Sequence, residues 1–203
     1  MPKFNDHQRQ AIGEQFIEHA RNLFTQFGLK KTSIADITTA VGVAQGTFYL
    51  FYRSKEELFL DILLLEERSV HASLSSFLNQ PKMNRSQFRQ FLLHSISLVE
   101  NNPLLKWLYD ADTMNAVIRK LSPEKQAELF QQDKDTMKSW IERGQAEGWI
   151  AAREPDHIVS LMQAVVLVAL QKQQIGEDRY AVTLELLCDC IAQGIIQEES
   201  TDD

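Results

Sequence analysis

Apolar residues recur at helical spacing along most of this chain. A first helix is predicted over about residues 8–27, because one face gathers Ile12, Phe16, Ala20, Leu23, Phe24 and Phe27. Gly28 follows at the place where a glycine typically ends a helix. No segment alternates between apolar and polar residues as a half-buried strand would, and the sequence has only 8 glycines and 5 prolines. The pattern therefore predicts an all-α fold.

Capping signals define the next two helices. Ser33, with Asp36 three residues later, resembles a capping box, and Thr32 is the alternative cap one residue earlier. The second helix is then expected to run to about Val41, where Gly42 breaks it. A short third helix is expected from residue 44 or 45 to about residue 51.

A long fourth helix is predicted over about residues 55–78, after the Ser-Lys-Glu-Glu capping box that begins at Ser54. Residues 79–84 form a predicted loop. Further helices are expected over about 85–101, 103–119 with a break near 110–112, 123–147, 155–174 and 178–197. The sequence predicts an N-terminal three-helix domain over residues 1–54 and a C-terminal helical bundle domain over residues 55–203, connected by the long helix.

Charge is distributed unevenly between these two domains. The net charge is −7, which is unfavourable for binding an acidic polymer. Residues 1–60, however, contain seven Lys or Arg against six Asp or Glu, and the rest of the chain contains 14 against 22. Only the N-terminal domain is therefore a plausible surface for contact with nucleic acid.

The segment from Thr32 to Phe51 reads as helix, tight glycine-containing turn and helix, which is typical of the DNA-binding helix-turn-helix. Apolar residues of this segment are expected to pack the two helices on the first one: Ile34, Ile37, Val41, Val43 and Phe48. The outer face is then expected to expose Gln45, Thr47, Tyr49 and Leu50 to the major groove, with Gly46 allowing close approach of the backbone.

Residues 12–60 strongly resemble the tetracycline-repressor-like (TetR/AcrR) family of transcriptional regulators. The matching residues are Ala20, Leu23-Phe24, Gly28, Thr32-Ser33, Asp36-Ile37, Gly42-Val43, Gly46-Thr47-Phe48-Tyr49 and Ser54-Lys55-Glu56-Glu57-Leu58. The resemblance implies a homodimer that binds a palindromic operator in double-stranded DNA and acts as a ligand-responsive repressor. The rest of the chain matches no pattern of this kind, as expected for a family whose regulatory domains diverge.

The resemblance also implies a role for each DNA-binding residue. Thr32, Ser33 and Lys55 are expected to contact phosphates, Gln45 and Thr47 to read bases, and Tyr49 to touch the backbone or a thymine methyl group. Three positions depart from the family pattern, where serine, lysine and histidine are common: Ala44, Gln45 and Phe51. The complete candidate set is Thr32, Ser33, Ala44, Gln45, Gly46, Thr47, Tyr49, Leu50, Phe51 and Lys55.

The last two predicted helices are candidates for the dimer interface. Residues 158–170 are apolar almost all round, as expected for a helix that contacts both its own core and a second subunit. The resemblance implies that these helices pair with their mates in a four-helix interface, and a monomeric core is the alternative. The candidate residues are Leu161, Val165, Val168, Leu184, Leu187, Cys188, Ile191 and Ile195.

The middle helices are the expected site of a small apolar effector, because the family uses this region as its pocket. Ordinary core packing is the alternative for each candidate: Trp107, Tyr109, Met114, Phe130, Met137, Trp140 and Met162. We hypothesise that the effector moves the fourth helix and changes the spacing of the two recognition helices, which must lie roughly 34–36 Å apart on DNA.

Other classes of function find less support in the sequence. Cys188 and Cys190 raise the alternative of a redox-responsive regulator, and Ala44, Gln45 and Phe51 that of a helical ligand-binding or interaction protein that has lost DNA binding. The five histidines show no metal spacing, and no catalytic constellation or cofactor motif is present, so we expect neither metal, cofactor nor enzyme activity. Residues 1–10 are polar and residues 158–170 are too short to span a bilayer, which favours the cytoplasm.

Overall fold

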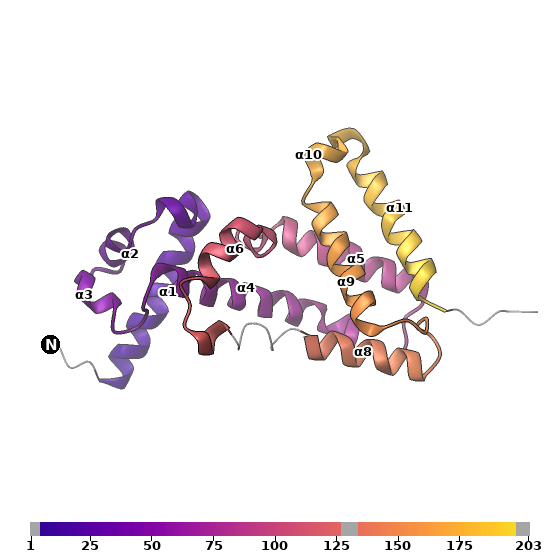
Figure 1. The fold of residues 1–203 in the computed structure, drawn as a ribbon, viewed down its shortest axis with the longest axis horizontal. Helices are drawn as coiled ribbons and strands as arrows, with labels where there is room; N and C mark the ends of the chain where they lie inside the picture. The colour runs from indigo at the N-terminus through magenta and orange to yellow at the C-terminus, as the bar shows by residue number, and fades with distance from the viewer. Residues whose placement is uncertain (1–4, 127–133, 198–203) are drawn as a thin grey trace, which may run out of the picture. The chain divides into compact units, whose positions relative to one another are not determined.

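A computed structural model describes residues 5–126 and 134–197, without the side chains of residues 134–136. Within these ranges every regular element is a helix, apart from one isolated antiparallel bridge between Ile150 and Ile196 (Figure 1). The all-α prediction is confirmed. None of the described helices is both long and apolar enough to cross a membrane.

The N-terminal helices follow the predicted order. They are α1 (Asp6–Lys31), α2 (Ile34–Val41), α3 (Gln45–Phe48) and α4 (Lys55–Leu78). Gly28 interrupts α1 with φ 76° and ψ 168°, a conformation that glycine adopts readily, so the helical segment predicted to end at residue 27 does change direction there.

The later helices differ from the prediction in where they break. They are α5 (Arg85–Glu100), the 3-10 helix η1 (Leu105–Tyr109), α6 (Ala111–Ile118), α8 (Lys134–Ala146), α9 (Pro155–Ala169), α10 (Lys172–Ile175) and α11 (Glu177–Ile195). The break expected near residues 110–112 is confirmed, because the Asp110 side chain accepts a hydrogen bond from the Thr113 N–H and caps α6. The helix expected over 155–174 divides into α9 and α10.

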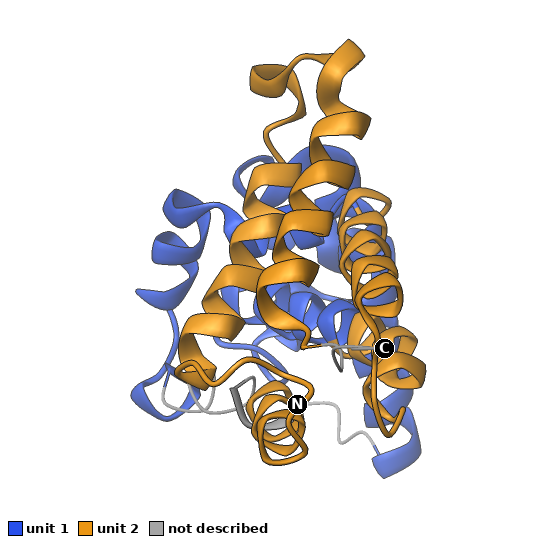
Figure 2. Cartoon of the chain, turned by 90° about the vertical axis from the view of Figure 1, so that its right-hand side faces the viewer, with its two compact units in different colours: residues 1–67, 103–126 blue, residues 68–102, 127–203 orange. Residues whose placement is uncertain are grey.

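The chain forms two compact units that do not divide at residue 54 (Figure 2). Unit 1 comprises residues 1–67 and 103–126, and unit 2 comprises residues 68–102 and 127–203. The first half of α4 belongs to unit 1 because its apolar side chains are buried there: Leu58, Phe59, Leu60, Ile62 and Leu63. Residues 103–126 join the same unit, where the Lys125 ammonium lies 2.7 Å from an Asp61 carboxylate oxygen.

Aromatic rings fill the core of unit 1. Phe16 of α1 packs edge-on against Phe48 of α3, with ring centroids 5.5 Å apart. Phe24 of α1 packs edge-on against Phe59 of α4 at 5.0 Å. The first contact fixes the helix-turn-helix on α1 and the second fixes α4 on α1, because aromatic side chains bury large apolar areas in a defined geometry.

Unit 2 is a bundle in which α5, α8, α9 and α11 surround one apolar core. Trp140 of α8 stacks on Phe88 of α5 at 6.0 Å and meets Trp149 edge-on at 5.2 Å. The Tyr180 hydroxyl at the start of α11 lies within hydrogen-bond distance of two acceptors, the Ala169 carbonyl oxygen at 2.8 Å and the Glu100 carboxylate, which share its one proton. Helices α5, α9 and α11 are thereby joined by hydrogen bonds as well as by packing.

Candidate nucleic-acid interface

The start of α2 is held by a reciprocal capping box. The Asp36 N–H donates to the Ser33 hydroxyl at 3.1 Å, and the Ser33 N–H donates to an Asp36 carboxylate oxygen at 2.8 Å. The Ser33 hydroxyl also donates to the Asp36 carboxylate at 2.6 Å, and this bond, followed by the one from the Ser33 N–H, lowers the pKa of Asp36 because both stabilise the charged carboxyl group. The capping box predicted from the sequence is confirmed.

A glycine turn joins α2 to α3. Gly42 adopts the left-handed conformation with φ 77° and ψ 30°, which places its N–H and that of Val43 on the last carbonyl groups of α2. Ile37 and Phe48 are buried on either side of this turn. The helix-turn-helix predicted from residues 32–51 is therefore present in unit 1 (Figure 1).

The third helix is shorter than predicted. It ends at Phe48, and the chain continues through tight turns in which the Leu50 N–H donates to the Thr47 carbonyl and the Phe51 N–H to the Phe48 carbonyl. The Phe51 ring turns inward and packs 5.3 Å from Phe16. Arg9 of α1 covers the same ring and donates to the Leu50 carbonyl oxygen. Packing against α1 therefore ends α3 early.

Most candidate DNA-binding residues of the helix-turn-helix are exposed: Ser33, Ala44, Gln45, Gly46, Tyr49 and Leu50. The expected exposure of Thr47 is wrong, since only 8% of its surface is accessible. Thr32 is also buried, at 2%, and its hydroxyl donates to the Gly28 carbonyl oxygen at 2.9 Å. Both threonines point into unit 1 because a threonine methyl group fits an apolar site and its hydroxyl can bond to a nearby carbonyl.

Lys55 and Phe51 also make contacts that the sequence did not predict. The Lys55 ammonium donates to the carbonyl oxygens of Leu29 and Thr32 at 2.8 and 2.6 Å, so at least two of its three N–H groups are bound within unit 1. Phe51 is partly buried in the aromatic cluster. An apolar residue at position 51 therefore contributes to the packing of α3 on α1.

A shallow groove of about 410 Å³ lies where α2, α3 and α4 begin. It is lined by Ser33, Ile34, Ala35, Gln45, Arg53, Ser54, Lys55 and Glu56. The sequence analysis missed Arg53, an exposed basic residue directly before the capping box of α4. The Glu57 N–H donates to the Ser54 hydroxyl, as predicted for the capping box. The Glu57 carboxylate, however, accepts the main-chain N–H of Arg53 at 2.7 Å rather than that of Ser54. Its position directly before a predicted helix start could have identified Arg53 as a candidate phosphate contact.

The candidate effector residues fall in different units. Trp107, Tyr109 and Met114 belong to unit 1, whereas Met137, Trp140 and Met162 belong to the core region of unit 2. Phe130 lies outside the described residues. Trp140 and Met162 are buried in ordinary apolar packing. Trp107 lines a cavity, and this cavity is in unit 1.

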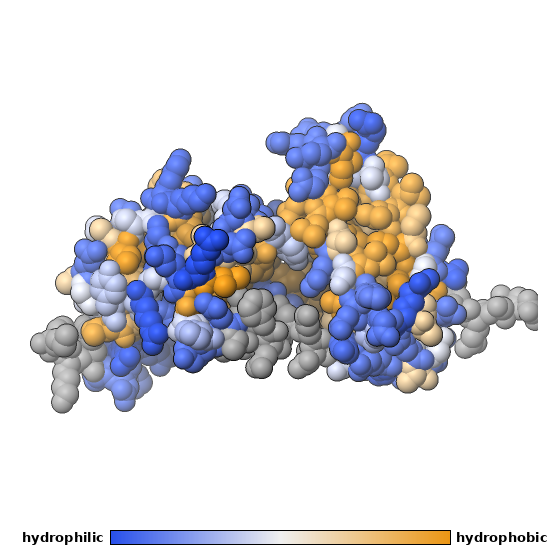
Figure 3. Space-filling model, in the orientation of Figure 1, coloured by the Kyte–Doolittle hydropathy of each residue, from blue (hydrophilic) through white to orange (hydrophobic). Residues whose placement is uncertain are grey.

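The candidate interface residues divide between the core and the surface of unit 2. Five are buried by their own chain: Val165, Leu184, Cys188, Ile191 and Ile195. Leu187 is partly buried, and Leu161 and Val168 are exposed. The structure adds three exposed apolar residues that the sequence analysis missed, Leu167, Val182 and Leu186, of which the last two are 71% and 63% accessible. Apolar surface covers α9 and α11 (Figure 3).

The two cysteines have different environments. Cys188 is fully buried, and burial raises the pKa of its thiol to about 11. Cys190 is exposed, and neither residue forms a disulfide. Among the described residues, no group of three or more His, Cys, Asp or Glu side chains lies close enough to hold a metal ion.

Comparison with known sequences assigns the helix-turn-helix region. Residues 16–62 match the family described as bacterial regulatory proteins, tetR family. This segment belongs to the TetR family. The match extends from Phe16 of α1 to Ile62 of α4, and so includes the capped start of α2, the Gly42 turn and the whole of α3.

Relatives of the TetR-family segment are regulators of the helix-turn-helix type. The chain is 28% identical to the transcriptional regulator AcrR of Shigella flexneri over 95 residues, which are 46% of this chain and 44% of AcrR. It is 43% identical to the regulator YhgD of Bacillus subtilis over 53 residues, which are 25% of this chain and 28% of YhgD. The chain thus spans less than half the length of these relatives.

Solved structures of TetR-family regulators share the fold over nearly the whole chain. A TetR-family regulator from Marinobacter aquaeolei superposes with a TM-score of 0.63 at 18% identity, covering 96% of this chain and all of the other. The regulator PfmR from Thermus thermophilus gives 0.58 at 23% identity, covering 88% and 97%. The helical C-terminal region therefore has the TetR-family fold as well.

Proposed function

We propose that this protein is a DNA-binding transcriptional regulator whose TetR-family segment binds an operator. The observation that carries the proposal is the capped α2, the left-handed Gly42 turn and the exposed outer side of α3, held on α1 by the Phe16–Phe48 contact. This is the arrangement that presents a short recognition helix to a major groove. Because the proposed partner is operator DNA, the proposal includes a cytoplasmic location.

The exposed side chains fit two kinds of contact. Both donors of Ser33 are bound to the Asp36 carboxylate, so the other N–H groups in the first turn of α2 are the ones suited to a phosphate, and the Arg53 guanidinium in the same groove supplies a positive charge. The Gln45 amide can pair with adenine, and the exposed Tyr49 and Leu50 offer apolar surface to thymine methyl groups. This set favours an operator half-site that contains A·T pairs.

Selection of bound DNA from a random-sequence pool tests the proposal. We expect one enriched palindromic sequence, with an affinity that falls steeply as salt is raised. Gln45→Ala is expected to cost about 1–3 kcal/mol on that site and to relax the preference at one position. Gln174→Ala on α10, an exposed glutamine of unit 2, is the matched control. No enrichment at low salt would reject DNA binding.

Homodimer formation is the second part of the proposal. A patch of exposed apolar side chains on α9 and α11 supports it: Leu161, Leu167, Val168, Val182 and Leu186. Exposed patches of this kind typically mark an interface, and a second copy doubles the number of bases read. Sedimentation equilibrium is expected to give a dimer that Leu186→Lys dissociates. Ser73→Lys on the exposed side of α4 is the control, and a monomeric native chain contradicts the idea.

Repression that responds to a small molecule is the third part. An effector acts on operator affinity only by binding two arrangements of the protein unequally, which is typically worth about 1–3 kcal/mol. The continuity of α4, which begins beside the DNA-facing groove and contributes to both compact units, supports such a response. Equal operator affinity with and without a bound effector would contradict it.

A further inference from the structure

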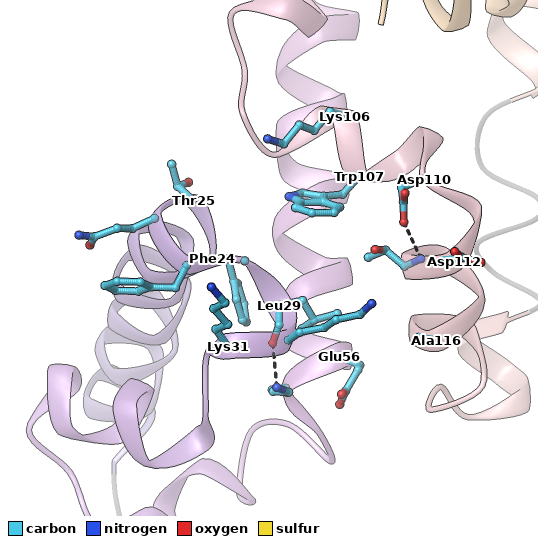
Figure 4. Close-up of a pocket in the computed structure, with 16 residues that line it drawn as sticks. Phe24, Thr25, Leu29, Lys31, Glu56, Lys106, Trp107, Asp110, Asp112 and Ala116 are labelled. Atoms are coloured by element: carbon cyan, nitrogen blue, oxygen red, sulfur yellow. Dashed lines mark hydrogen bonds between the residues drawn. The ribbon is translucent and has the colours of Figure 1, made fainter. Parts of the chain in front are cut away.

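Unit 1 contains a cavity of about 650 Å³ beside the helix-turn-helix (Figure 4). Its walls are the end of α1 from Phe24 to Lys31, the first turn of α4, and residues of η1 and α6. This volume is within the range of pockets that hold small molecules.

Aromatic side chains supply the apolar part of the wall. Phe24 is buried, Phe27 is 49% accessible, and Trp107 of η1 is partly exposed. Trp107 lies close to the main chain of α1, since a Cβ added to Gly28 would sit 3.8 Å from its Cζ2 atom. A flat ring placed between Phe27 and Trp107 would remove apolar surface of both from water.

The charged side chains favour an anion. The Lys55 ammonium already donates to the carbonyl oxygens of Leu29 and Thr32, which have no helical partner at the end of α1. The Lys30 ammonium is close enough to Asp110 to stabilise its carboxylate, whereas the Lys31 ammonium, which lines the same wall, has no hydrogen bond or ion pair among the described residues. The Lys106 ammonium makes a cation–π contact, 5.3 Å from the centre of the Trp107 ring.

The carboxylates of the cavity are compensated by helix starts. Asp110 accepts the Thr113 N–H at 2.7 Å, and that contact together with nearby Lys30 lowers its pKa. Asp112 and Glu56 lie in the first turns of α6 and α4, where the partial positive charge of the helix end stabilises an anion. The uncompensated charge of the cavity is therefore positive.

We propose that this cavity binds an aromatic carboxylate, with its ring between Phe27 and Trp107 and its carboxylate near Lys31 and Lys106, and that binding lowers operator affinity. The second clause rests on the proposed function. Lys55 and Glu56 line both this cavity and the groove at the start of α2, α3 and α4. An anion in the cavity competes with the Thr32 carbonyl for the Lys55 ammonium, which loosens the main chain directly before Ser33.

Calorimetric titration of the full chain without DNA tests the site. The probe is 1-naphthoate, and 1-naphthylmethylammonium is its cationic counterpart. We expect one naphthoate per chain, a binding constant about fivefold weaker in Lys106→Gln and Lys31→Gln, and about tenfold weaker in Trp107→Leu. Thermal unfolding of each variant shows that it is folded, and the two surface lysine variants remain informative if Trp107→Leu is not.

Lys172→Gln is the matched control, because the Lys172 ammonium lies 5.4 Å from the centre of the Tyr180 ring in unit 2 and reproduces the Lys106–Trp107 geometry. It is expected to leave naphthoate binding unchanged. Three results would overturn the site: an equal loss in Lys172→Gln, binding of the cation as tight as that of naphthoate, or no naphthoate binding up to about 5 mM.

Operator affinity with and without saturating naphthoate tests the coupling. We expect naphthoate to weaken operator binding about fivefold or more. Equal affinities, with naphthoate bound, would overturn the coupling. A chain that binds no operator under any condition would reject the proposed function, whereas calorimetry would still decide the site, so the two failures are distinct.

Discussion

The ammonium nitrogen of Lys55 lies 2.6 Å from the carbonyl oxygen of Thr32, which ties the first residue of α4 to the residue before the cap of α2. A second bond from the same ammonium reaches Leu29 at 2.8 Å. One partly exposed lysine therefore holds together the end of α1, the start of α2 and the start of α4. This junction lies beside the groove that contains Ser33 and Arg53.

Lys55→Met is expected to destabilise the protein by about 1–2 kcal/mol, because two charge-assisted hydrogen bonds are lost at a partly solvated position. Urea unfolding of the full chain measures the change. Lys31→Met is the control, since the Lys31 ammonium has no hydrogen-bond partner among the described residues. Equal stabilities of the two variants would show that the Lys55 bonds contribute nothing.

Ser33→Ala is expected to cost about 1 kcal/mol, because the first N–H groups of α2 lose their side-chain cap. Ser33→Thr should retain most of the stability, because its hydroxyl can both accept the Asp36 N–H and donate to the Asp36 carboxylate. Ser73→Ala is a matched control on α4, where the hydroxyl only donates to the Ser69 carbonyl of its own helix. A loss in Ser73→Ala as large as in Ser33→Ala would contradict the role of the cap.

The same capping box has a consequence for pH. The pKa of Asp36 is lowered in the folded chain, so its contribution to stability is present above the ordinary carboxyl pKa and is lost as the pH falls through the lowered value. Titration of Asp36 by NMR is expected to show a higher pKa in Ser33→Ala than in the native chain. An unchanged pKa would mean that the Ser33 bonds are not formed in solution.

The two buried tryptophans of unit 2 give a paired prediction. The Trp149 indole N–H donates to the Glu147 carboxylate at 2.8 Å, whereas the Trp140 indole N–H has no partner among the described residues. Trp149→Phe and Trp140→Phe remove similar volumes from one core. We expect Trp149→Phe to cost about 1 kcal/mol more in urea unfolding, because only that change removes a hydrogen bond. The opposite order would refute this.

Cys188 and Cys190 should differ sharply in reactivity. With its pKa raised to about 11, Cys188 is protonated at neutral pH and shielded from solvent. An Ellman titration is expected to detect one fast thiol per chain, absent in Cys190→Ser and present in Cys188→Ser. The fast reaction should slow as protein concentration rises if copies associate through α9 and α11. Fast modification of Cys188 would contradict the prediction.

The raised pKa of Cys188 also sets a direction for stability at high pH. The unfolded thiol loses its proton first, so the contribution of Cys188 to stability is complete below about pH 9 and is lost as the pH rises toward 11. Cys188→Ala is expected to be less sensitive to pH than the native chain over this window. Urea unfolding at pH 8 and pH 10 measures the difference.

Local signals predicted the helix-turn-helix well. Ser33 with Asp36, Gly42 and the apolar positions Ile37 and Phe48 act within a few residues of one another, so the sequence specifies their conformation directly. Asp110 gives the break before α6 in the same way. The fold class followed from the helical spacing of apolar residues, which can be recognised without knowing which helices pack together.

Burial of polar side chains could not be predicted in this way. Thr32 and Thr47 carry hydroxyl groups and were predicted from the sequence to contact DNA, yet both are buried. Whether the Lys55 ammonium faces solvent depends on where the carbonyl groups of Leu29 and Thr32 come to lie, 23 or more residues away in the chain. The cavity in unit 1 likewise needs residues 103–126 to pack near α1, which no local pattern indicates.

Helix α11 is anchored at both of its ends, by Tyr180 at its start and by the Ile150–Ile196 bridge directly after its last turn. The Gln197 N–H also donates to the Trp149 carbonyl, which secures the chain beyond the helix. Hydrogen bonds at both ends restrict the movement of α11 relative to the rest of unit 2. Val182 and Leu186 are therefore presented in one fixed geometry, and a second copy that docks on them loses little conformational entropy.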